Sequence, residues 1–334
     1  MTAHRDTFVI DHLPPASAQP VFLFGPDYQY PERLNAGAIL DGQVAAGRGA
    51  HPAVVWGDQA WRYARLLARA NQYANLLAST PAFLPGARVL LHGPNSPECV
   101  AAWFGIVKAG GVVVATMPLL RAGELAKVVD KAAIDWAIAD QALSDAVDGA
   151  RGQTRRLGHI AWLGAPEVDA QPETFANLDT FAADPVLIAF TSGTTGQPKG
   201  CVHLHRDVLA MADGFSRHIL KPGPTEVFSG TPPFAFTFGL GGIVIFPLVA
   251  GATIALPTRP GFEGLCEAIA RHRVTTLFTA PTGYRALLKL CAGDQLSSLT
   301  KCVSAGEALP AATSEAWFER TGLRIIRSEE HTSE

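Results

Sequence analysis

The stretch Thr191–Gly200 reads T-S-G-T-T-G-Q-P-K-G and holds three glycines, four hydroxyl side chains, one proline and one lysine. That composition disfavours both a helix and a central strand. The glycines allow positive φ and a close approach of the backbone to a ligand, and successive N–H groups in such a loop can form a concave anion site. The hydroxyls add donors and Lys199 adds a positive charge, so we predict a loop that binds the phosphates of a polyphosphate.

The flanking residues predict that this loop joins two strands. Pro185–Phe190 (P-V-L-I-A-F) is an uninterrupted apolar run, typical of a strand buried on both faces, and Cys201–His205 alternates as a second strand would. The stretch is not a Walker A loop, because G-x-x-x-x-G-K-[ST] counted from Gly193 places Pro198 where the second glycine belongs. The alternative interpretation is an ordinary glycine-rich surface hairpin.

The ten residues resemble the phosphate loop of the adenylate-forming (AMP-binding) superfamily, which includes acyl- and aryl-CoA ligases, luciferases and carrier-protein adenylation domains. Within it, the chain is most similar to benzoate-CoA ligases and especially 2-aminobenzoate-CoA ligases. The resemblance extends from the N-terminus to about Ile326. The likeness to the aryl-CoA ligases lies in four shorter segments, Pro31–Asn35, His203–Leu209, Pro232–Gly242 and Ser304–Pro310.

Composition limits the class of protein. The 334 residues are 48% hydrophobic and 17% charged, enough for a large core in one or two domains. A net charge of −3 indicates no basic surface for nucleic acid. No signal peptide is expected at the N-terminus. The uncharged stretch Val227–Thr258 contains several prolines, so no membrane span is expected there. The five cysteines form no C-x-x-C pair, which favours reduced thiols and a cytoplasmic protein.

Alternating elements predict an α/β fold. Strands are expected at Arg88–His92, Val112–Thr116, Trp136–Ala139 and His159–Leu163, with helices between them, which indicates a parallel sheet with right-handed crossovers. Ser96 followed by Pro97 is expected to begin a helix that ends near Ala109. A second βα series is expected from about residue 185, with strands at Ala252–Leu256, Val274–Ala280, Leu299–Val303 and Arg324–Ile326.

The resemblance implies the large N-terminal domain of the adenylate-forming fold, with two stacked, mainly parallel βα sheets that are incomplete at the C-terminus. We expect a first subdomain at residues 1–180 and a second, with the phosphate loop and the acyl pocket, at 181–326. Residues 327–334 (R-S-E-E-H-T-S-E) resemble a translated sequencing adapter, and we hypothesise that they are not native. The family's catalytic lysine would belong to a C-terminal domain, so no catalytic residue is named, and the chain alone is expected to be inactive.

The resemblance also assigns binding roles. It implies that ATP phosphates contact the loop, that the segment after Leu299–Val303 lies beside adenine, and that two further segments wall an acyl pocket, where aromatic side chains favour a flat ring. The implied ligands are ATP with Mg²⁺, coenzyme A as co-substrate and a small aromatic carboxylate. The implied nucleotide-binding residues are Thr191, Ser192, Gly193, Thr194, Thr195, Gly196, Lys199, Ala305, Gly306 and Glu307, and the implied substrate-binding residues are Phe236, Thr237, Phe238, Gly239, Ala280, Thr282 and Gly283.

Each of these segments has a simpler interpretation. Phe234, Phe236 and Phe238 alternate as in a strand with an aromatic core face, and Ser304–Glu307 could be an ordinary turn. Cys201, His203 and His205 would share one face of a strand and could bind zinc, but no fourth ligand is evident, and no protein metal site is expected.

The predicted function is that of an ATP-dependent aryl-acid:CoA ligase, which activates benzoate or 2-aminobenzoate as the aryl-AMP and transfers it to CoA. Neither a nucleic acid nor a membrane is an expected partner, and the sequence leaves the oligomeric state open. Three alternatives remain: an adenylation enzyme that loads a carrier protein, a fatty-acyl-CoA ligase with a deeper pocket, and a non-catalytic nucleotide-binding remnant.

Overall fold

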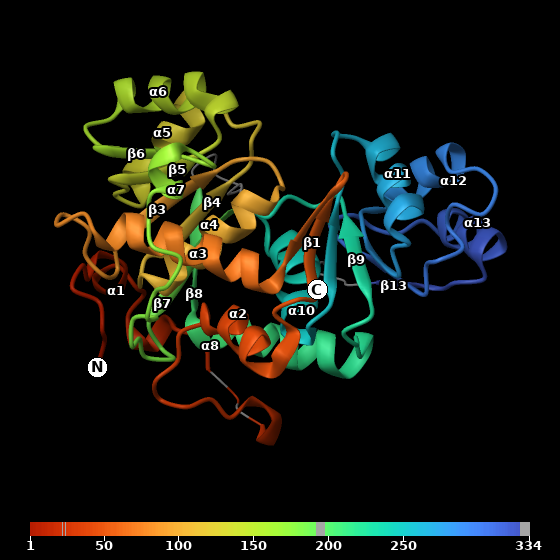
Figure 1. Ribbon diagram of the computed structural model, residues 1–334, viewed down its shortest axis with the longest axis horizontal. Helices are drawn as coiled ribbons and strands as arrows, with labels where there is room; N and C mark the ends of the chain where they lie inside the picture. Colours follow the sequence, from red (N-terminus) through yellow and green to blue (C-terminus); the bar gives the residue numbers. More distant parts are fainter. Residues whose placement is uncertain (22, 24, 192–197, 328–334) are drawn as a thin grey trace. The chain divides into compact units, whose positions relative to one another are not determined.

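The computed structural model describes residues 1–21, 23, 25–191 and 198–327, and the chain forms two compact units (Figure 1). Unit 1 comprises Met1–Gly42 and Arg65–Gly214, and unit 2 comprises Gln43–Ala64 and Phe215–Glu334. These boundaries differ from the division we predict at residues 180 and 181. The difference arises because residues 43–64 supply strands to the sheet of unit 2, whereas residues 185–204 pair within the sheet of unit 1.

Unit 1 is built on a six-stranded sheet in the order β6-β5-β3-β4-β7-β8. The pairs among β3 to β7 are parallel, as predicted, and β8 runs antiparallel to β7. The strands are β3 (Arg88–His92), β4 (Val112–Thr116), β5 (Trp136–Ala139), β6 (His159–Trp162), β7 (Pro185–Thr191) and β8 (Lys199–Leu204). The phosphate-loop sequence therefore joins two strands, as the flanking residues predict.

Helices connect and cover these strands. Ser96 caps α4 through its Oγ, which accepts the N–H of Cys99 at 3.1 Å, and Pro97 is the first helical residue, which confirms the predicted helix start. Helices α5 and α6 pack against each other (Figure 1). The helical segments up to residue 220 are α1 (Phe8–Asp11), η1 (Ala16–Ala18), η2 (Pro26–Tyr28), α2 (Ala38–Gln43), η3 (Val44–Arg48), α3 (Tyr63–Ala78), α4 (Pro97–Lys108), α5 (Ala122–Lys131), η4 (Gln141–Leu143), α6 (Ser144–Gln153), α7 (Pro166–Asp169), α8 (His205–Met211) and η5 (Ala212–Leu220).

Unit 2 is built on a seven-stranded sheet in the order β13-β12-β11-β9-β10-β1-β2. Strands β1 and β2 form a hairpin, and β1 also pairs in parallel with β10, so the hairpin extends the second sheet. All other pairs in this sheet are parallel. The strands are β1 (Pro52–Trp56), β2 (Gln59–Arg62), β9 (Val227–Gly230), β10 (Thr253–Leu256), β11 (Thr276–Phe278), β12 (Lys301–Ser304) and β13 (Ile325–Arg327).

Three helices, α11 to α13, lie side by side in unit 2 (Figure 1). Their buried faces meet the sheet in a core that includes Leu265, Leu277, Tyr284 and Trp317. Helix α13 ends at Gly322, whose φ of 72° is left-handed, a conformation that favours glycine at the end of a helix. The helical segments of this part are α9 (Thr237–Gly239), η6 (Leu240–Ile245), α10 (Phe246–Ala250), α11 (Phe262–His272), α12 (Pro281–Leu290) and α13 (Ala311–Thr321).

The structure corrects the prediction that every cysteine is a free thiol. Cys266 of α11 and Cys291, which follows α12, form a disulfide, whereas Cys99, Cys201 and Cys302 are free. Spacing along the sequence could not reveal this pair, because the packing of α11 against α12 brings the two residues together.

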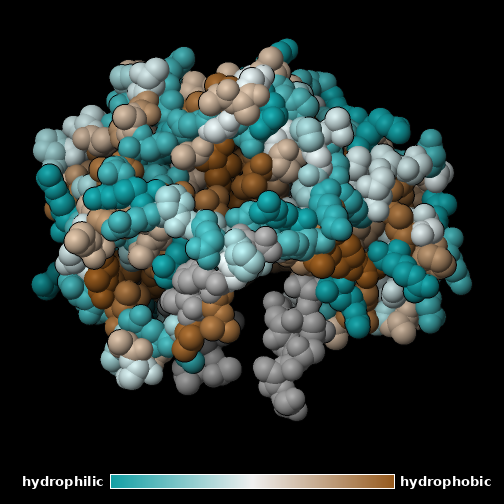
Figure 2. Space-filling view, turned by 90° about the horizontal axis from the view of Figure 1, so that it is seen from below, coloured by the Kyte–Doolittle hydropathy of each residue, from teal (hydrophilic) through white to brown (hydrophobic). Residues whose placement is uncertain are grey.

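None of the helices in the described part of the chain is long and apolar enough to cross a membrane. On the face in Figure 2, apolar patches are separated by hydrophilic side chains.

Candidate functional site

The ends of β7 and β8 carry the described part of the predicted phosphate loop. Thr191 is the last residue of β7, Lys199 is the first of β8, and the two residues pair across the hairpin. Both are exposed, and Thr191 lies at the carboxyl end of a strand that is parallel to β4, where α/β sheets place their ligands. The remaining predicted loop residues, Ser192, Gly193, Thr194, Thr195 and Gly196, lie outside the described residues.

Gly200 has a packing role beside this loop. A Cβ at this position would lie 2.8 Å from Cγ2 of Ile188 and 3.5 Å from the ring of Phe190, closer than real Cβ atoms approach in the first case. A side chain here would therefore push β8 away from β7. Glycine at position 200 therefore permits the close packing of β8 on β7 directly after Lys199.

An aromatic cluster in unit 2 holds part of the predicted acyl-pocket wall. The ring of Phe278 on β11 lies 5.6 Å from that of Phe238, 6.2 Å from that of Phe246 and 6.3 Å from that of Phe228. These separations are favourable for aromatic pairs. Phe278 is buried and Phe238 is partly exposed, so the cluster presents an aromatic surface from a fixed base.

The strand interpretation of Phe234, Phe236 and Phe238 is wrong, because α9 begins at Thr237. Phe234 is buried, whereas Phe236 is 41% exposed. The start of the helix at Thr237 breaks the alternation that a strand would need. Thr237 is exposed.

Glycines bring this helical segment close to its neighbours. A Cβ on Gly239 would lie 2.2 Å from the carbonyl oxygen of Pro233, and a Cβ on Gly242 would lie 2.3 Å from Cδ1 of Phe278. Neither distance is possible for a real side chain. Gly242 therefore lets the helical segment lie against Phe278, and Gly239 lets it approach the backbone of Pro233.

The start of α12 supplies the second predicted wall segment. Ala280 is partly buried, Thr282 is exposed, and Gly283 is buried with its Cα hydrogens against Thr279, whose Oγ1 would be 2.1 Å from a Cβ. Thr279 also shares a hydrogen bond of 2.7 Å with the hydroxyl of Thr231. The carboxyl ends of β9 and β11 are thus linked by two hydroxyls that the sequence did not single out.

The predicted adenine-binding segment follows β12. Ala305 is buried, whereas Gly306 and Glu307 are exposed. Gly306 has a φ of 83°, a left-handed conformation that favours glycine, and no atom lies within 4 Å of a Cβ placed there. The hydroxyl of Thr282 donates to Oε1 of Glu307 at 3.1 Å, so the structure brings the predicted acyl-pocket and adenine segments together within unit 2.

The zinc interpretation of Cys201, His203 and His205 is not supported. His205 begins α8 instead of ending β8, and its Nδ1 accepts the N–H of Ala36 at 3.1 Å. Burial lowers the pKa of His203 and lowers that of His205 to about 3. Among the described residues, no group of three or more His, Cys, Asp or Glu side chains could hold a metal ion.

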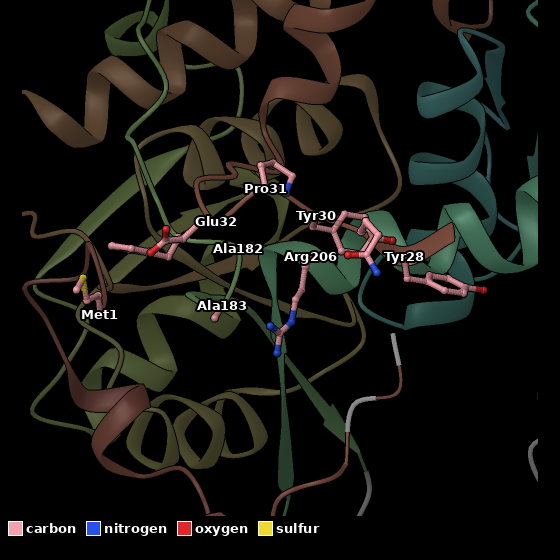
Figure 3. Close-up of a pocket in the computed structure, with 10 residues that line it drawn as sticks. Met1, Tyr28, Tyr30, Pro31, Glu32, Ala182, Ala183 and Arg206 are labelled. Atoms are coloured by element: carbon pink, nitrogen blue, oxygen red, sulfur yellow. The ribbon is translucent and has the colours of Figure 1, made fainter. Parts of the chain in front are cut away.

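A separate cavity of about 380 Å³ lies in unit 1 (Figure 3). Arg206 extends from α8 between the two tyrosines, Tyr28 and Tyr30, and the opposite wall, which includes Met1 and Glu32. The predicted site residues that the structure describes do not line this cavity. Arg206 follows β8, whereas the phosphate-loop residues precede it, so the cavity is at the opposite end of that strand.

Comparison with known proteins identifies the family that the sequence resembles. The sequence profile of the AMP-binding enzyme family matches residues 42–328. A benzoate-CoA ligase of Thauera aromatica is 30% identical over 312 residues, which cover 90% of this chain and 59% of that protein. A 3-hydroxybenzoate-CoA/4-hydroxybenzoate-CoA ligase of the same organism is 31% identical over 306 residues, 87% of this chain and 58% of that protein.

A solved structure is also similar. The anthranilate CoA ligase AuaEII in complex with anthranoyl-AMP superposes with a TM-score of 0.84 at 31% identity, over 90% of this chain and 60% of that one. The chain therefore has the fold that the sequence predicts, and it spans about 60% of the length of these relatives.

Proposed function

The chain belongs to the AMP-binding enzyme family, and we propose that it is part of an ATP-dependent aryl-acid:CoA ligase that acts on benzoate or 2-aminobenzoate. The proposal of an aromatic substrate rests on the packing of Phe238 against Phe278, with glycines nearby at positions where larger side chains would not fit. A flat ring can stack or make edge contacts on such a surface. The similarity to benzoate-CoA and anthranilate-CoA ligases supports the same substrate class.

The reaction proceeds in two balanced steps. The carboxylate oxygen attacks the α-phosphorus of ATP, the bond to pyrophosphate breaks, and an aryl-AMP mixed anhydride forms. The thiol of coenzyme A then attacks the carbonyl carbon, loses its proton, and displaces AMP to give the thioester. The first step needs the carboxylate aligned with the α-phosphorus, the second needs the thiol aligned with the carbonyl carbon, and both need a site that excludes water.

The residues at the ends of the hairpin fit a polyphosphate. Thr191 and Lys199 are exposed at the carboxyl edge of the unit 1 sheet, one with a hydroxyl donor and the other with an ammonium group. We assign the β- and γ-phosphates to these two residues with Ser192–Gly196 between them. Each well-placed donor can contribute about 3 kcal/mol to the transition state. When bound, Mg²⁺ would neutralise part of the phosphate charge, since it prefers phosphate oxygens to many protein ligands.

The segments of unit 2 fit an aryl-adenylate. Gly306 leaves open space beside Ala305, where a planar base can approach the backbone. Phe236, Thr237, Phe238 and Gly239 would face the ring from one side, and Ala280, Thr282 and Gly283 would do so from the start of α12. The hydrogen bond from Thr282 to Glu307 supports this assignment, because it joins the start of α12 to the segment that follows β12.

The proposal is tested by measuring binding of ATP and of a non-hydrolysable aryl-adenylate analogue to the chain. Because the chain spans about 60% of the length of its relatives, pyrophosphate release with a panel of acids is measured on the protein expressed from the complete reading frame. We expect benzoate or 2-aminobenzoate to be preferred over acetate and fatty acids, and an aryl-CoA product to appear when coenzyme A is added. Lys199→Ala should weaken ATP binding without changing the unfolding free energy. Preference for a long aliphatic acid, or transfer only to a carrier protein, would refute the aryl-CoA assignment. Absence of any nucleotide binding would refute the ligase proposal as a whole.

A further inference from the structure

Contacts at the base of the β7 and β8 hairpin can contribute to fixing its register. In two-residue hairpins the turn sets which residues pair, but here Thr191 pairs with Lys199 and residues 192–198 lie between them. β8 is the last strand in the order of its sheet, and the pairing shifts between Pro185 and Leu187. A slip by one residue would turn Lys199 to the opposite face.

At the far end of the hairpin, Asp184 bonds to three separate segments. Its side chain is buried, and Oδ2 accepts the N–H of Phe181 at 2.9 Å and the N–H of Ala3 at 3.1 Å. Its backbone carbonyl accepts the N–H of His205 at 3.1 Å, which continues the pairing beyond β8. A single residue therefore connects the start of β7, the end of β8 and the N-terminus.

The N-terminal arm, Met1–Asp6, is itself fixed to the sheet. The N–H groups of Arg5 and Asp6 both donate to the carbonyl of Pro85 at 2.9 Å, and the Asp6 carboxylate pairs with Arg88 of β3 at 2.5 Å. His4 is buried against Gly86, where a Cβ would lie 2.9 Å from the side chain of His4. The arm is thus a rigid support for Asp184.

His205 holds the other strand of the hairpin from a third direction. Its side chain is fully buried, and its Nδ1 accepts the N–H of Ala36. Burial lowers the pKa of both His4 and His205, so both rings are neutral near pH 7 and Nδ1 of His205 can accept this bond. The base of the hairpin is therefore held by the residues that precede α2 as well as by the N-terminal arm.

We propose that Asp184, supported by the N-terminal arm, is a positioning residue that fixes the register of β7 and β8 and thereby places Thr191 and Lys199 for phosphate binding. This inference rests on the proposed function. A paired hairpin transmits the position of its base to its tip, because the cross-strand hydrogen bonds cannot shift singly. Asp184 acts through the two strands and touches no ligand.

The test uses the whole chain with substitutions at two positions. Asp184→Ala removes the acceptor, whereas Asp184→Asn keeps an amide oxygen that can accept both N–H groups. Ala3→Pro removes one donor to Asp184, and Ala3→Gly keeps it. Asp41→Asn is the control for lost stability, because the Asp41 carboxylate bonds Lys108 and Asn177 in the same unit, and neither residue belongs to the hairpin or to the N-terminal arm. The readouts are the ATP dissociation constant, the unfolding free energy and hydrogen exchange of residues 185–191 and 199–204.

Asp184→Ala should weaken ATP binding about tenfold, equivalent to ~1.4 kcal/mol, and should speed exchange in both strands. Ala3→Pro should change both quantities in the same direction, whereas Asp184→Asn should retain most of the binding, and Ala3→Gly and Asp41→Asn should leave the ATP dissociation constant unchanged. Unchanged ATP binding and unchanged exchange in Asp184→Ala would overturn the inference. So would an equal loss of binding in Asp41→Asn, since general destabilisation would then explain the effect.

The outcomes separate this inference from the proposed function. If the unsubstituted chain binds no ATP, the proposed function fails, and the exchange measurement still decides whether Asp184 sets the register. If it binds ATP and the Asp184 and Ala3 variants bind equally well, the proposed function stands and the positioning role fails. If Asp184→Ala does not fold, the comparison of Ala3→Pro with Ala3→Gly decides the question.

Discussion

The hydroxyl of Thr282 donates a hydrogen bond of 3.1 Å to Oε1 of Glu307. Thr282 stands in the first turn of α12 and Glu307 follows β12, so the bond joins two segments to which we assign different parts of one ligand. Both side chains are exposed, and the bond contributes little to the stability of the fold. Its importance would lie in keeping the two segments together when an aryl-adenylate binds.

We therefore expect Thr282→Val and Glu307→Ala each to weaken binding of an aryl-adenylate analogue, and their effects to be coupled by about 0.5–1.5 kcal/mol, the usual net value of one hydrogen bond. Calorimetric titration of the two single variants and the double variant measures this coupling. Thr282→Ser is the control, because it keeps the hydroxyl. Strictly additive losses would show that the bond has no part in ligand binding.

Gly242→Ala should destabilise unit 2. A Cβ at this position would lie 2.3 Å from the ring of Phe278, and overpacking of a core costs about 1–3 kcal/mol. Replacing a helical glycine with alanine gains only about 0.5–1 kcal/mol, so the clash dominates. Denaturant unfolding measures the sum.

Gly223→Ala is the matched control for this substitution. No atom lies within 4 Å of a Cβ at Gly223, so we expect its unfolding free energy to stay within about 0.5 kcal/mol of the unsubstituted chain. If Gly242→Ala is as stable as Gly223→Ala, the close approach of η6 to Phe278 is not a constraint on the sequence.

Acid should destabilise unit 1 through His205. Burial lowers the pKa of this histidine to about 3, so the folded state keeps it neutral while the unfolded chain takes up a proton below about pH 6.5. The unfolding free energy should therefore fall as the pH falls from about 6.5 towards 3, by about 1.4 kcal/mol per pH unit from this residue. His4, whose pKa burial also lowers, adds to the same trend.

The check is unfolding at several pH values with His205→Asn, which retains an acceptor for the N–H of Ala36. We expect this variant to show a shallower loss of stability between pH 6.5 and 5. An identical slope in both proteins would mean that carboxylates elsewhere account for the acid sensitivity.

The buried pair of Lys108 and Asp41 should respond unequally to removal of its two members. Nζ of Lys108 lies 2.6 Å from Oδ2 of Asp41, and the lysine side chain is fully buried while the aspartate is 36% exposed. Asp41→Asn leaves a buried ammonium group without its counter-charge and should cost up to about 3 kcal/mol. Lys108→Met fills the same space without a charge, and Asp41 keeps the amide of Asn177 and access to water.

Denaturant unfolding of the two single variants gives the order of their stabilities. We expect Lys108→Met to be the more stable of the two. The reverse order would show that packing of the lysine stem, and not the buried charge, governs this site.

The sequence predicted most of the local structure. Arg88–His92, Val112–Thr116 and Trp136–Ala139 form strands at the predicted bounds, because continuous apolar runs between turn residues are a local signal. The helix cap at Ser96 is also a local signal, because its Oγ accepts the N–H of Cys99, only three positions away. The phosphate-loop sequence was also found between two strands, although its central residues lie outside the described part of the chain.

Other features depended on contacts between distant residues. The alternation of Phe234, Phe236 and Phe238 suggested a strand, but packing against β11 places Thr237–Gly239 in a helical turn. The sequence places Phe278 in an apolar strand, and only the tertiary structure shows that three other phenylalanines pack around it. Asp184 and Ala3 are separated by 181 positions, so no local pattern could indicate their hydrogen bond.

By itself, the sequence determined the strands, the helix ends and a glycine-rich loop suited to phosphates, because each depends on neighbouring residues and the backbone freedom of glycine. Only the tertiary structure decided that β1 and β2 extend the second sheet, that Thr282 reaches Glu307, and that Ala3 of the N-terminal arm bonds Asp184 at the base of the β7 and β8 hairpin. These contacts join residues far apart in the chain, and their free energy is gained only when the whole unit packs.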